Sequence, residues 1–321
     1  MVTVCFCMFC QKENHFLNGK INDKKILDAK KDQIENLEEN QAIFHGEEVV
    51  AFYSLEDQEV DFQKFIQLEL LGDVLQIAHT WDIFSKNIEA LQLDFELLTR
   101  DRESEPIPAS NHVMAAHNIF IEKGAKVEFC SLNASTGPIY IGANSEIMEG
   151  SLIRGPLALC ENSTLKMGSK IYGATTVGPF CRVGGEVNNS VIFGYSNKGH
   201  EGYLGNSVLG EWCNIGADTN NSNLKNNYAE VRLWDYETEG FARTGLQFCG
   251  LMMGDHSKCG INTMFNTGTV VGVSANIFGS GFPRNFIPSF SWGGSAGMSV
   301  YKTEKAFEVA KVVMTRRGFD F

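Results

Sequence analysis

Aliphatic residues recur at every sixth position through the middle of the chain. Eight successive positions, from Ile141 to Val183 in steps of six, are all aliphatic, and the period returns further on. The positions are Ile141, Ile147, Ile153, Leu159, Leu165, Ile171, Val177, Val183, Leu209, Ile215, Met253, Cys259, Phe265, Val271 and Ile277. An α-helix cannot use this period, and a βαβ unit is too long for it. A short strand plus a turn fits, so three hexapeptides would form one triangular coil of about 18 residues. The pattern therefore predicts a mainly β protein built as a parallel β-helix with an aliphatic interior.

Two segments break the period, and a helical pattern follows it. Val187–Gly202 and Thr219–Gly245 are rich in Asn, Ser and Gly, which predicts loops on the side of the solenoid, often its binding face. Ser299–Arg317 has apolar residues at helical spacing, and it predicts a C-terminal helix that caps the open end. These apolar residues are Val300, Phe307, Ala310 and Val313.

The first third of the chain has a different composition. Residues 1–105 hold no proline, few glycines and all of the net charge of −12. We expect a helix at Lys24–Asn40, a strand at Glu48–Ser54, a helix capped by Thr80 or Asp82, and a linker at Arg100–Pro108. The predicted division is an α/β region with a linker helix (1–105), the β-helix (106–295) and a C-terminal helix (296–321).

Charge and cysteine content narrow the class of protein. A net charge of −12 argues against nucleic acid as the partner. No apolar run reaches the roughly 18 residues of a membrane span, and Met1–Cys10 lacks the basic start of a signal peptide. Nine cysteines without a secretory signal predict reduced thiols and a cytoplasmic protein. Cys5, Cys7 and Cys10 could bind zinc, but an apolar strand is the favoured interpretation, so no metal site is expected.

Gly199–Thr219 is the most informative stretch. It resembles the acetyltransferase half of the bifunctional UDP-N-acetylglucosamine pyrophosphorylase/glucosamine-1-phosphate N-acetyltransferase family, which reads G-H-x-x-Y-x-G-D-x-x-I-G-x-x-x-N-I-G-A-G-T. Further segments are similar to the Bacteroidetes-type sugar nucleotidyltransferase branch of that family. They are Gly184–Asn189, Gly194–His200, Asn220–Asn227, Gly254–Lys258, Asn262–Gly268 and Pro288–Gly294. The resemblance implies a left-handed β-helix, a homotrimer with sites between neighbouring prisms, acetyl-CoA as co-substrate and an amino-sugar 1-phosphate as acceptor.

The resemblance also assigns roles to single residues. His200 would be the general base, and a base is needed because an amino sugar arrives mostly as an ammonium ion. His256 is the competing candidate. The residues that match family positions around the sugar are Tyr203, Asn214 and Asn223. Lys225, Lys198 or Arg232 could supply the charge for the sugar phosphate, because the family's own basic pair is missing here. Those implied to bind the acyl-CoA are Ala217, Ile261 and Asn262.

Several departures from the family pattern keep alternatives open. Asn188-Asn189 replaces a Lys-Lys pair, and Ile261 replaces a serine. Residues 1–105 contain no Gly-rich loop of the G-x-G-T-R-M type, so they resemble a truncated nucleotidyltransferase domain, with residues 15–54 similar to its late part. Uridylyl or thymidylyl transfer, with Mg²⁺, would then require a full N-terminal domain. A sugar-nucleotide-binding trimer without catalysis is the third possibility.

Overall fold

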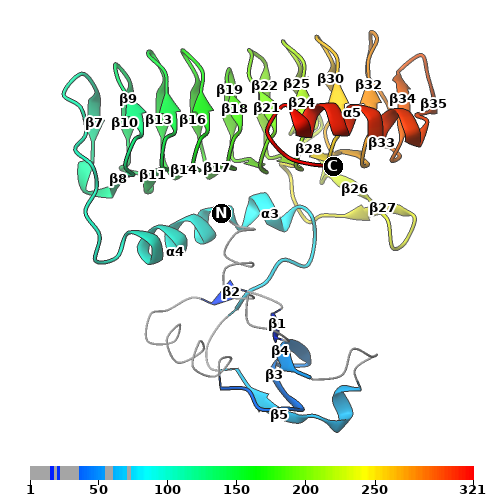
Figure 1. Ribbon diagram of the computed structural model, residues 1–321. Coiled ribbons are helices and arrows are strands. Elements are labelled where there is room, and N and C mark those ends of the chain that lie inside the picture. Colours follow the sequence, from blue (N-terminus) through cyan, green and yellow to red (C-terminus); the bar gives the residue numbers. More distant parts are fainter. Residues whose placement is uncertain (1–14, 18–19, 22–35, 55–60, 71–73) are drawn as a thin grey trace.

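The computed structural model describes residues 15–17, 20–21, 36–54, 61–70 and 74–321. It is a mainly β structure, with a parallel β-solenoid of about ten turns, a small N-terminal α/β region and a C-terminal helix (Figure 1). Each turn contributes one short strand to each of three faces, and the strands of one face pair in parallel. The predicted architecture is confirmed.

The three faces follow one another along the chain within every turn. The first face contains β7 (His112–Met114), β10 (Ser131–Asn133), β13 (Leu152–Arg154), β16 (Lys170–Tyr172), β19 (Glu186–Asn188) and β22 (Tyr203–Gly205), and β25 (Asn220–Asn221) and β30 (Met264–Phe265) form a separate pair beside β22. The second face contains β8 (Ile119–Ile121), β11 (Ile139–Ile141), β14 (Leu157–Leu159), β17 (Thr175–Val177), β20 (Val191–Ile192), β23 (Val208–Leu209), β28 (Leu251–Met253), β31 (Thr269–Val271) and β33 (Phe286–Ile287). The third face contains β9 (Lys126–Val127), β12 (Glu146–Ile147), β15 (Thr164–Leu165), β18 (Arg182–Val183), β21 (Asn197–Lys198), β24 (Asn214–Ile215), β29 (Lys258–Cys259), β32 (Asn276–Ile277), β34 (Ser291–Gly294) and β35 (Gly297–Val300).

The predicted six-residue positions form the core of the prism. All of them are buried, because alternate side chains of each short strand point inward. Corner serines satisfy backbone groups inside the solenoid; the Ser163 hydroxyl, for example, donates to the Gly178 carbonyl and accepts from the Cys181 N–H. The six described cysteines are buried, and each is a thiol rather than part of a disulfide.

The two predicted interruptions have different structures. Val187–Gly202 is not a side loop, which corrects the sequence prediction: it forms a turn that is shorter than its neighbours. Thr164 pairs with Arg182, 18 positions on, whereas Arg182 pairs with Asn197 after only 15. The second interruption is a true insertion, and it contains the antiparallel hairpin β26 (Arg232–Asp235) and β27 (Gly240–Arg243).

The N-terminal region is described in part. β1 (His15–Leu17), β4 (Glu48–Tyr53), β3 (Gln41–His45) and β5 (Ile66–Glu69) form one sheet, β2 (Lys20–Ile21) pairs with β6 (Val74–Leu75), and η1 is a short 3₁₀ helix (Phe62–Lys64). β4 confirms the strand predicted at Glu48–Ser54. Most of the helix predicted at Lys24–Asn40 lies outside the described residues, as do Met1–Cys10 with their three cysteines; residues 36–40 form turns.

Two helices join this region to the solenoid. α3 (Asp82–Ser85) and α4 (Asn87–Thr99) lie along the second face, and the turn η2 (Ala116–Asn118) precedes β8. Asn87 is fully buried, and its amide donates to the Ala174 carbonyl at 2.8 Å and accepts from the Thr176 hydroxyl at 3.0 Å. Neither Thr80 nor Asp82 caps the helix, which corrects the prediction: the N-cap of α3 is Trp81, and it makes no side-chain capping bond. The Asp82 carboxylate accepts instead from the N–H groups of Ala78 and His79. Among the described residues, no helix is long and apolar enough to cross a bilayer.

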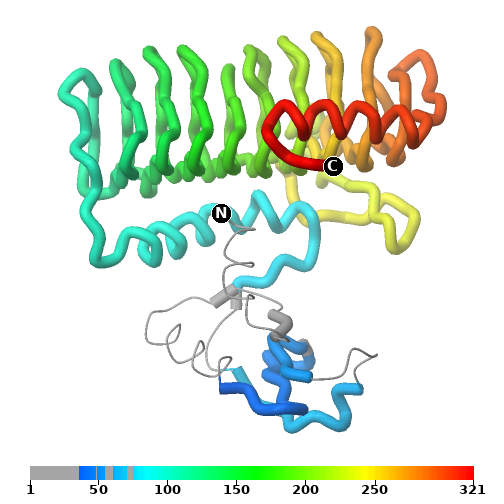
Figure 2. Tube along the Cα trace, viewed as in Figure 1, coloured from blue at the N-terminus to red at the C-terminus, as the bar shows by residue number. Residues whose placement is uncertain are grey.

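The C-terminal helix α5 (Thr303–Thr315) does not occupy the place we predicted. It runs back along the side of the solenoid, and the antiparallel hairpin β34–β35 ends the third face instead (Figure 2). Ala306 and Ala310 are the buried residues of α5. After α5, Phe319 lies edge-on against the rings of Tyr195 and Trp212. The helix therefore covers a corner of the solenoid.

Candidate functional site

Four successive turns place a glycine at the same position of one corner. Where the third face leads into the first, each inward residue is followed by a glycine, and together these four form what we call the glycine column. It consists of Gly184, Gly199, Gly216 and Gly260. Ladder hydrogen bonds hold it at this corner, as in Gly184 N–H to the Lys198 carbonyl and Gly216 N–H to the Cys259 carbonyl. Gly184 is buried, whereas Gly199, Gly216 and Gly260 are partly exposed, so the corner presents backbone without side chains over three turns.

Only two of these glycines are required by the fold. A Cβ on Gly216 would lie 2.3 Å from the Gly260 backbone, and one on Gly184 would lie 2.7 Å from the Gly199 carbonyl oxygen. A Cβ on Gly199 would meet nothing closer than 3.9 Å, and one on Gly260 nothing closer than 3.5 Å. Neither of these two has left-handed backbone. Neither a close contact nor a left-handed backbone therefore requires glycine at 199 or 260.

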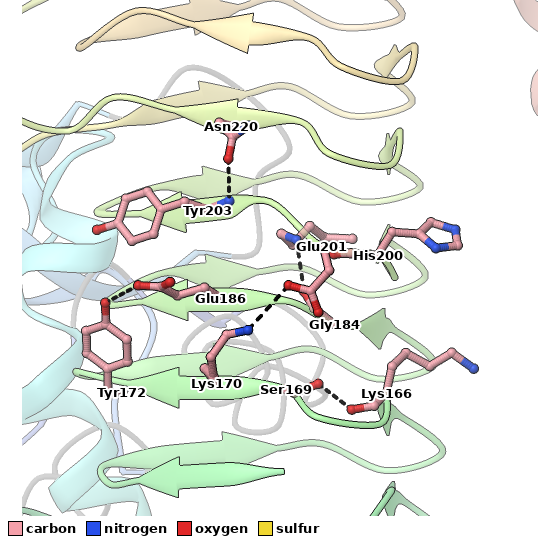
Figure 3. Close-up of polar contacts among 11 residues, drawn as sticks. Lys166, Ser169, Lys170, Tyr172, Gly184, Glu186, His200, Glu201, Tyr203 and Asn220 are labelled. Atoms are coloured by element: carbon pink, nitrogen blue, oxygen red, sulfur yellow. Dashed lines mark hydrogen bonds and ion pairs between the residues drawn. The ribbon is translucent and has the colours of Figure 1, made fainter. Parts of the chain in front are cut away.

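The predicted base lies directly beside the glycine column. His200 follows Gly199 and is exposed, and Figure 3 shows its imidazole pointing away from the solenoid. In the next two turns Ala217 and Ile261 occupy the equivalent position, and the Asn262 N–H donates to the Ala217 carbonyl at 2.8 Å. Ile261 is 68% exposed. The structure thus brings His200 together with all three residues expected at the acyl-CoA.

Asn214 lies on the third-face side of the same column. It is exposed in β24, immediately before the inward residue Ile215 and Gly216. Its backbone N–H donates to the Ser257 carbonyl at 3.1 Å. His200 and Asn214 therefore flank the glycine column from its two sides.

Two predicted sugar-binding residues lie at the opposite edge of the first face. The Asn223 amide donates to the Tyr203 hydroxyl at 2.9 Å and to Asn206 Oδ1 at 2.7 Å. Burial raises the pKa of Tyr203, so its hydroxyl remains a neutral hydrogen-bonding group. Figure 3 shows Tyr203 and His200 directed toward opposite sides of this face. Within one chain the structure does not bring them together.

The two lysines expected at a phosphate are engaged elsewhere. Lys225 Nζ donates to the Glu230 carbonyl at 2.9 Å within the insertion. Lys198 is only 2% exposed and faces the interior, where its ammonium donates to the carbonyls of Gly184 and His200. This placement corrects the prediction for Lys198, because an ammonium inside the solenoid cannot contact a ligand on its surface.

Other charged groups of the first face escaped the sequence analysis. Lys170 Nζ lies 3.3 Å from the Glu201 carboxylate, and the Tyr172 hydroxyl donates to Glu186 at 2.5 Å. That hydrogen bond, and then burial, raise the pKa of Tyr172. Lys166 extends on the same side as His200 (Figure 3). For Lys170 and Tyr172 the signal in the sequence is their position alone: they flank the inward Ile171 and therefore point outward.

His256, the competing base, lies at a different corner. Its ring stacks on Trp212 at 6.0 Å, and its Nδ1 is buried without a hydrogen-bond partner. Burial, and then the nearby Lys258, lower its pKa. His256 is the end of a stack of rings rather than an open proton acceptor. Within the described part of the chain, no group of three or more His, Cys, Asp or Glu could hold a metal ion.

The N-terminal third of the chain matches the model of a known protein family. Residues 6–103 match the family described as sugar nucleotidyl transferase, and the β-solenoid follows this domain. No curated protein matches the chain.

Two solved structures are similar to the chain. One is the polySia-specific acetyltransferase NeuO, which is 13% identical, with a TM-score of 0.31 over 66% of this chain and 99% of that one. The other is a mutant of AntD, an N-acyltransferase from Bacillus cereus, in complex with dTDP-4-amino-4,6-dideoxyglucose and coenzyme A. It is 12% identical, with a TM-score of 0.26 over 64% of this chain and 90% of that one. At these TM-scores neither structure bears on the activity of this chain.

Proposed function

We propose that the protein is an N-acetyltransferase that moves the acetyl group of acetyl-CoA to the amine of an amino-sugar 1-phosphate, in sugar-nucleotide biosynthesis. The observation that carries the proposal is the glycine column beside His200. The pantetheine arm of coenzyme A is a long, narrow chain, and it can lie against backbone that no side chain covers. Strands of neighbouring turns are about 4.8 Å apart, so the three partly exposed glycines, Gly199, Gly216 and Gly260, give roughly 10 Å of such backbone.

His200 supplies the proton acceptor that this reaction needs. The amino sugar binds as an ammonium ion, and His200 removes one proton to free the nitrogen lone pair. The amine attacks the thioester carbonyl, the C–S bond breaks, and the coenzyme A thiolate leaves and takes up a proton. An exposed imidazole suits this role, because histidine is the side chain that exchanges a proton most readily at neutral pH.

A second copy of the chain would complete the acceptor site. Because His200 and Tyr203 point to opposite sides of the first face, one site can use both only if two copies meet. Exposed apolar side chains follow the His200 edge, among them Phe129 (67%), Met167 (69%) and Ile261 (68%), and these suit a contact between copies. Asn223 would join Tyr203 at the sugar, and Lys166 would replace the buried Lys198 at the phosphate. A homotrimer is the proposed assembly.

Mass spectrometry of the product tests the activity. Purified protein, acetyl-CoA and glucosamine 1-phosphate should give N-acetylglucosamine 1-phosphate. His200→Ala should reduce kcat by about 10²–10⁴-fold, whereas His117→Ala, which removes an exposed imidazole from η2, should leave it unchanged. A folded wild-type protein that acetylates no amino-sugar 1-phosphate would refute the proposal.

Mixing two inactive variants tests the shared site. His200→Ala and Tyr203→Ala should each be inactive alone. Co-expressed in equal amounts, they should recover about a quarter of wild-type activity, the statistical share of sites with both groups intact. Absence of recovery in a mixed trimer, verified by light scattering, would place both groups in the same copy and contradict the proposed assembly.

Nucleotidyl transfer is the second candidate, and the family match over residues 6–103 favours it. This reaction joins a nucleoside triphosphate to a sugar 1-phosphate, releases pyrophosphate and uses Mg²⁺. The test is pyrophosphate release from UTP or dTTP in the presence of N-acetylglucosamine 1-phosphate and Mg²⁺. Release would establish this activity, and its absence would leave acetyl transfer as the proposed reaction of the chain.

A further inference from the structure

One lysine occupies an inward position of the third face. The inward positions from β9 to β32 are Val127, Ile147, Leu165, Val183, Lys198, Ile215, Cys259 and Ile277. Val183 pairs directly with Lys198, so an ammonium group replaces an aliphatic side chain inside the core. Burial of an amine is unfavourable unless hydrogen bonds compensate for lost hydration. Its presence therefore calls for a specific partner.

Two backbone carbonyls accept hydrogen bonds from this ammonium group. Lys198 Nζ donates to the Gly184 carbonyl at 2.9 Å and to the His200 carbonyl at 2.6 Å. Burial lowers the pKa of Lys198 to about 8, so at neutral pH it still carries the proton that both bonds use. The bridge joins the corner of one turn to the corner that carries the proposed base.

A shortened corner explains why a lysine is needed here. Leu165 pairs with Val183 and Lys170 with Glu186, so residues 183–186 replace the six residues 165–170. In the preceding turn the Ser169 hydroxyl donates to the equivalent carbonyl, that of Lys166, and three turns further on the Thr263 hydroxyl donates to the Gly260 carbonyl. The shortened corner contains no Ser or Thr. The Lys198 ammonium takes the place of the missing hydroxyl.

The shortened corner also lies close to the backbone of the proposed base, His200. Gly185 has a φ of 71°, and a Cβ there would lie 2.7 Å from the His200 carbonyl oxygen and 2.8 Å from Glu201 Cα. Lys198 bonds to this crowded segment from inside. Contacts from two directions therefore fix the backbone from which the His200 imidazole projects.

We propose that Lys198 is a positioning residue, whose buried ammonium bridges the Gly184 and His200 carbonyls and thereby sets the orientation of the His200 imidazole. Its effect on catalysis rests on the proposed acetyltransferase function. Its effect on the His200 backbone does not.

Lys198→Met tests the inference, because methionine suits an apolar position of similar length. We expect a folded protein in which kcat for acetyl transfer falls about 10–100-fold, the size of effect that a misplacement of about 1 Å produces. The KM values should change less than about twofold, because ligand contacts remain. The amide NMR resonances of Gly199 and Gly202 should also shift. Leu165→Met is the matched control, two turns away in the same row, and should change neither quantity.

The outcomes separate the two proposals. If the wild-type protein transfers no acetyl group, the proposed function fails, and the Gly199 and Gly202 resonances still decide the role of Lys198. A folded Lys198→Met variant with wild-type kcat, or with corner resonances like those of Leu165→Met, would overturn the inference. If Lys198→Met does not fold, Lys198→Leu replaces it. Failure of both to fold would assign Lys198 to the stability of the whole solenoid and also overturn the inference.

Discussion

The same turns of the solenoid form two corners with different structures. Where the third face meets the first, the glycine column exposes backbone beside His200. Where the second face meets the third, the same turns place rings at one position, and we call this set the aromatic ladder. It consists of Phe180, Tyr195, Trp212 and His256. One repeat thus produces an open corner, which we propose as the ligand surface, and a filled corner, which stabilises the solenoid.

The aromatic ladder shows how the filled corner is stabilised. Tyr195 and Trp212 stack with centroids 4.3 Å apart and planes within 5°. Their φ values are 61° and 59°, a left-handed backbone that is unfavourable for large residues by about 1–2 kcal/mol each. Stacking and the cover of α5 with Phe319 offset this strain. In the glycine column, by contrast, Gly199, Gly216 and Gly260 remain partly exposed.

Loss of a central ring should have the largest effect on stability. Trp212 is 7% exposed between Tyr195 and His256, so Trp212→Ala should lower the free energy of unfolding by about 3–5 kcal/mol. Urea denaturation measures this loss. Trp292→Ala, at a tryptophan that is 40% exposed outside the ladder, is the control and should lose much less. A Trp212→Ala protein that is stable yet inactive would break the separation between the corners.

The sequence predicted the solenoid because its signal is local. An inward side chain every six residues is visible in the chain itself, from Ile141 to Ile277. The prediction for Val187–Gly202 was wrong for two reasons: Lys198 occupies an inward position, and the turn is short. The six-residue aliphatic pattern therefore ends there, although the solenoid continues. The place of α5 was also missed, since ring contacts between Phe319 and residues over a hundred positions away leave no periodic trace.

The candidate site was predictable along the repeat but not across it. His200, Ala217 and Ile261 align because equivalent residues of successive turns stack, and the sequence motif already contained this spacing. The side of the first face toward which Tyr203 points could not be predicted from the sequence, because it depends on which edge of a three-residue strand its ring covers. The inward position of Lys198 was missed because a lysine in a motif suggests a surface group that binds a ligand, and only the strand register reveals that it points inward.

The buried ammonium should make stability depend on pH. Burial lowers the folded-state pKa of Lys198 to about 8, below its usual 10.5. Between these values the unfolded chain holds more protons, so the free energy of unfolding should rise with pH relative to Lys198→Met, by about 2 kcal/mol at pH 10. Below pH 8 the difference should be constant.

Urea denaturation of both proteins at pH 7, 8.5 and 10 measures this difference. The comparison is needed because burial raises the pKa of the Cys181 and Cys213 thiols to about 12, which lowers stability as pH rises above 9. Both proteins contain these thiols, so their contribution cancels. A difference that does not vary with pH would show that the ammonium is not buried as described.

Side chains added to the glycine column should weaken the binding of acetyl-CoA. Gly199→Ala and Gly260→Ala fit the solenoid, because each new Cβ has at least 3.5 Å of clearance. We expect the Kd for acetyl-CoA to rise about tenfold, equivalent to about 1.4 kcal/mol, with stability unchanged within about 0.5 kcal/mol. Isothermal calorimetry measures the Kd. Gly240→Ala, whose Cβ would lie 3.7 Å from the Thr238 carbonyl oxygen, is the matched control. Unchanged affinity in both column variants would remove the case for this corner as the binding surface.

Removal of the cover over the aromatic ladder should have the smallest effect. Phe319 is 39% exposed and lies edge-on to Tyr195 at 5.0 Å and to Trp212 at 5.7 Å, so Phe319→Ala should cost about 1 kcal/mol of stability. Phe321→Ala, at a ring that contacts Phe307 but not the ladder, is the control. A double-mutant cycle with Trp212→Ala should give a coupling energy of about 0.5–1.5 kcal/mol. The Kd for acetyl-CoA should not change, because Phe319 and the glycine column lie at different corners. If Phe319→Ala weakened acetyl-CoA binding instead of stability, the ligand would have to contact the aromatic ladder, and the division between an open and a filled corner would fail.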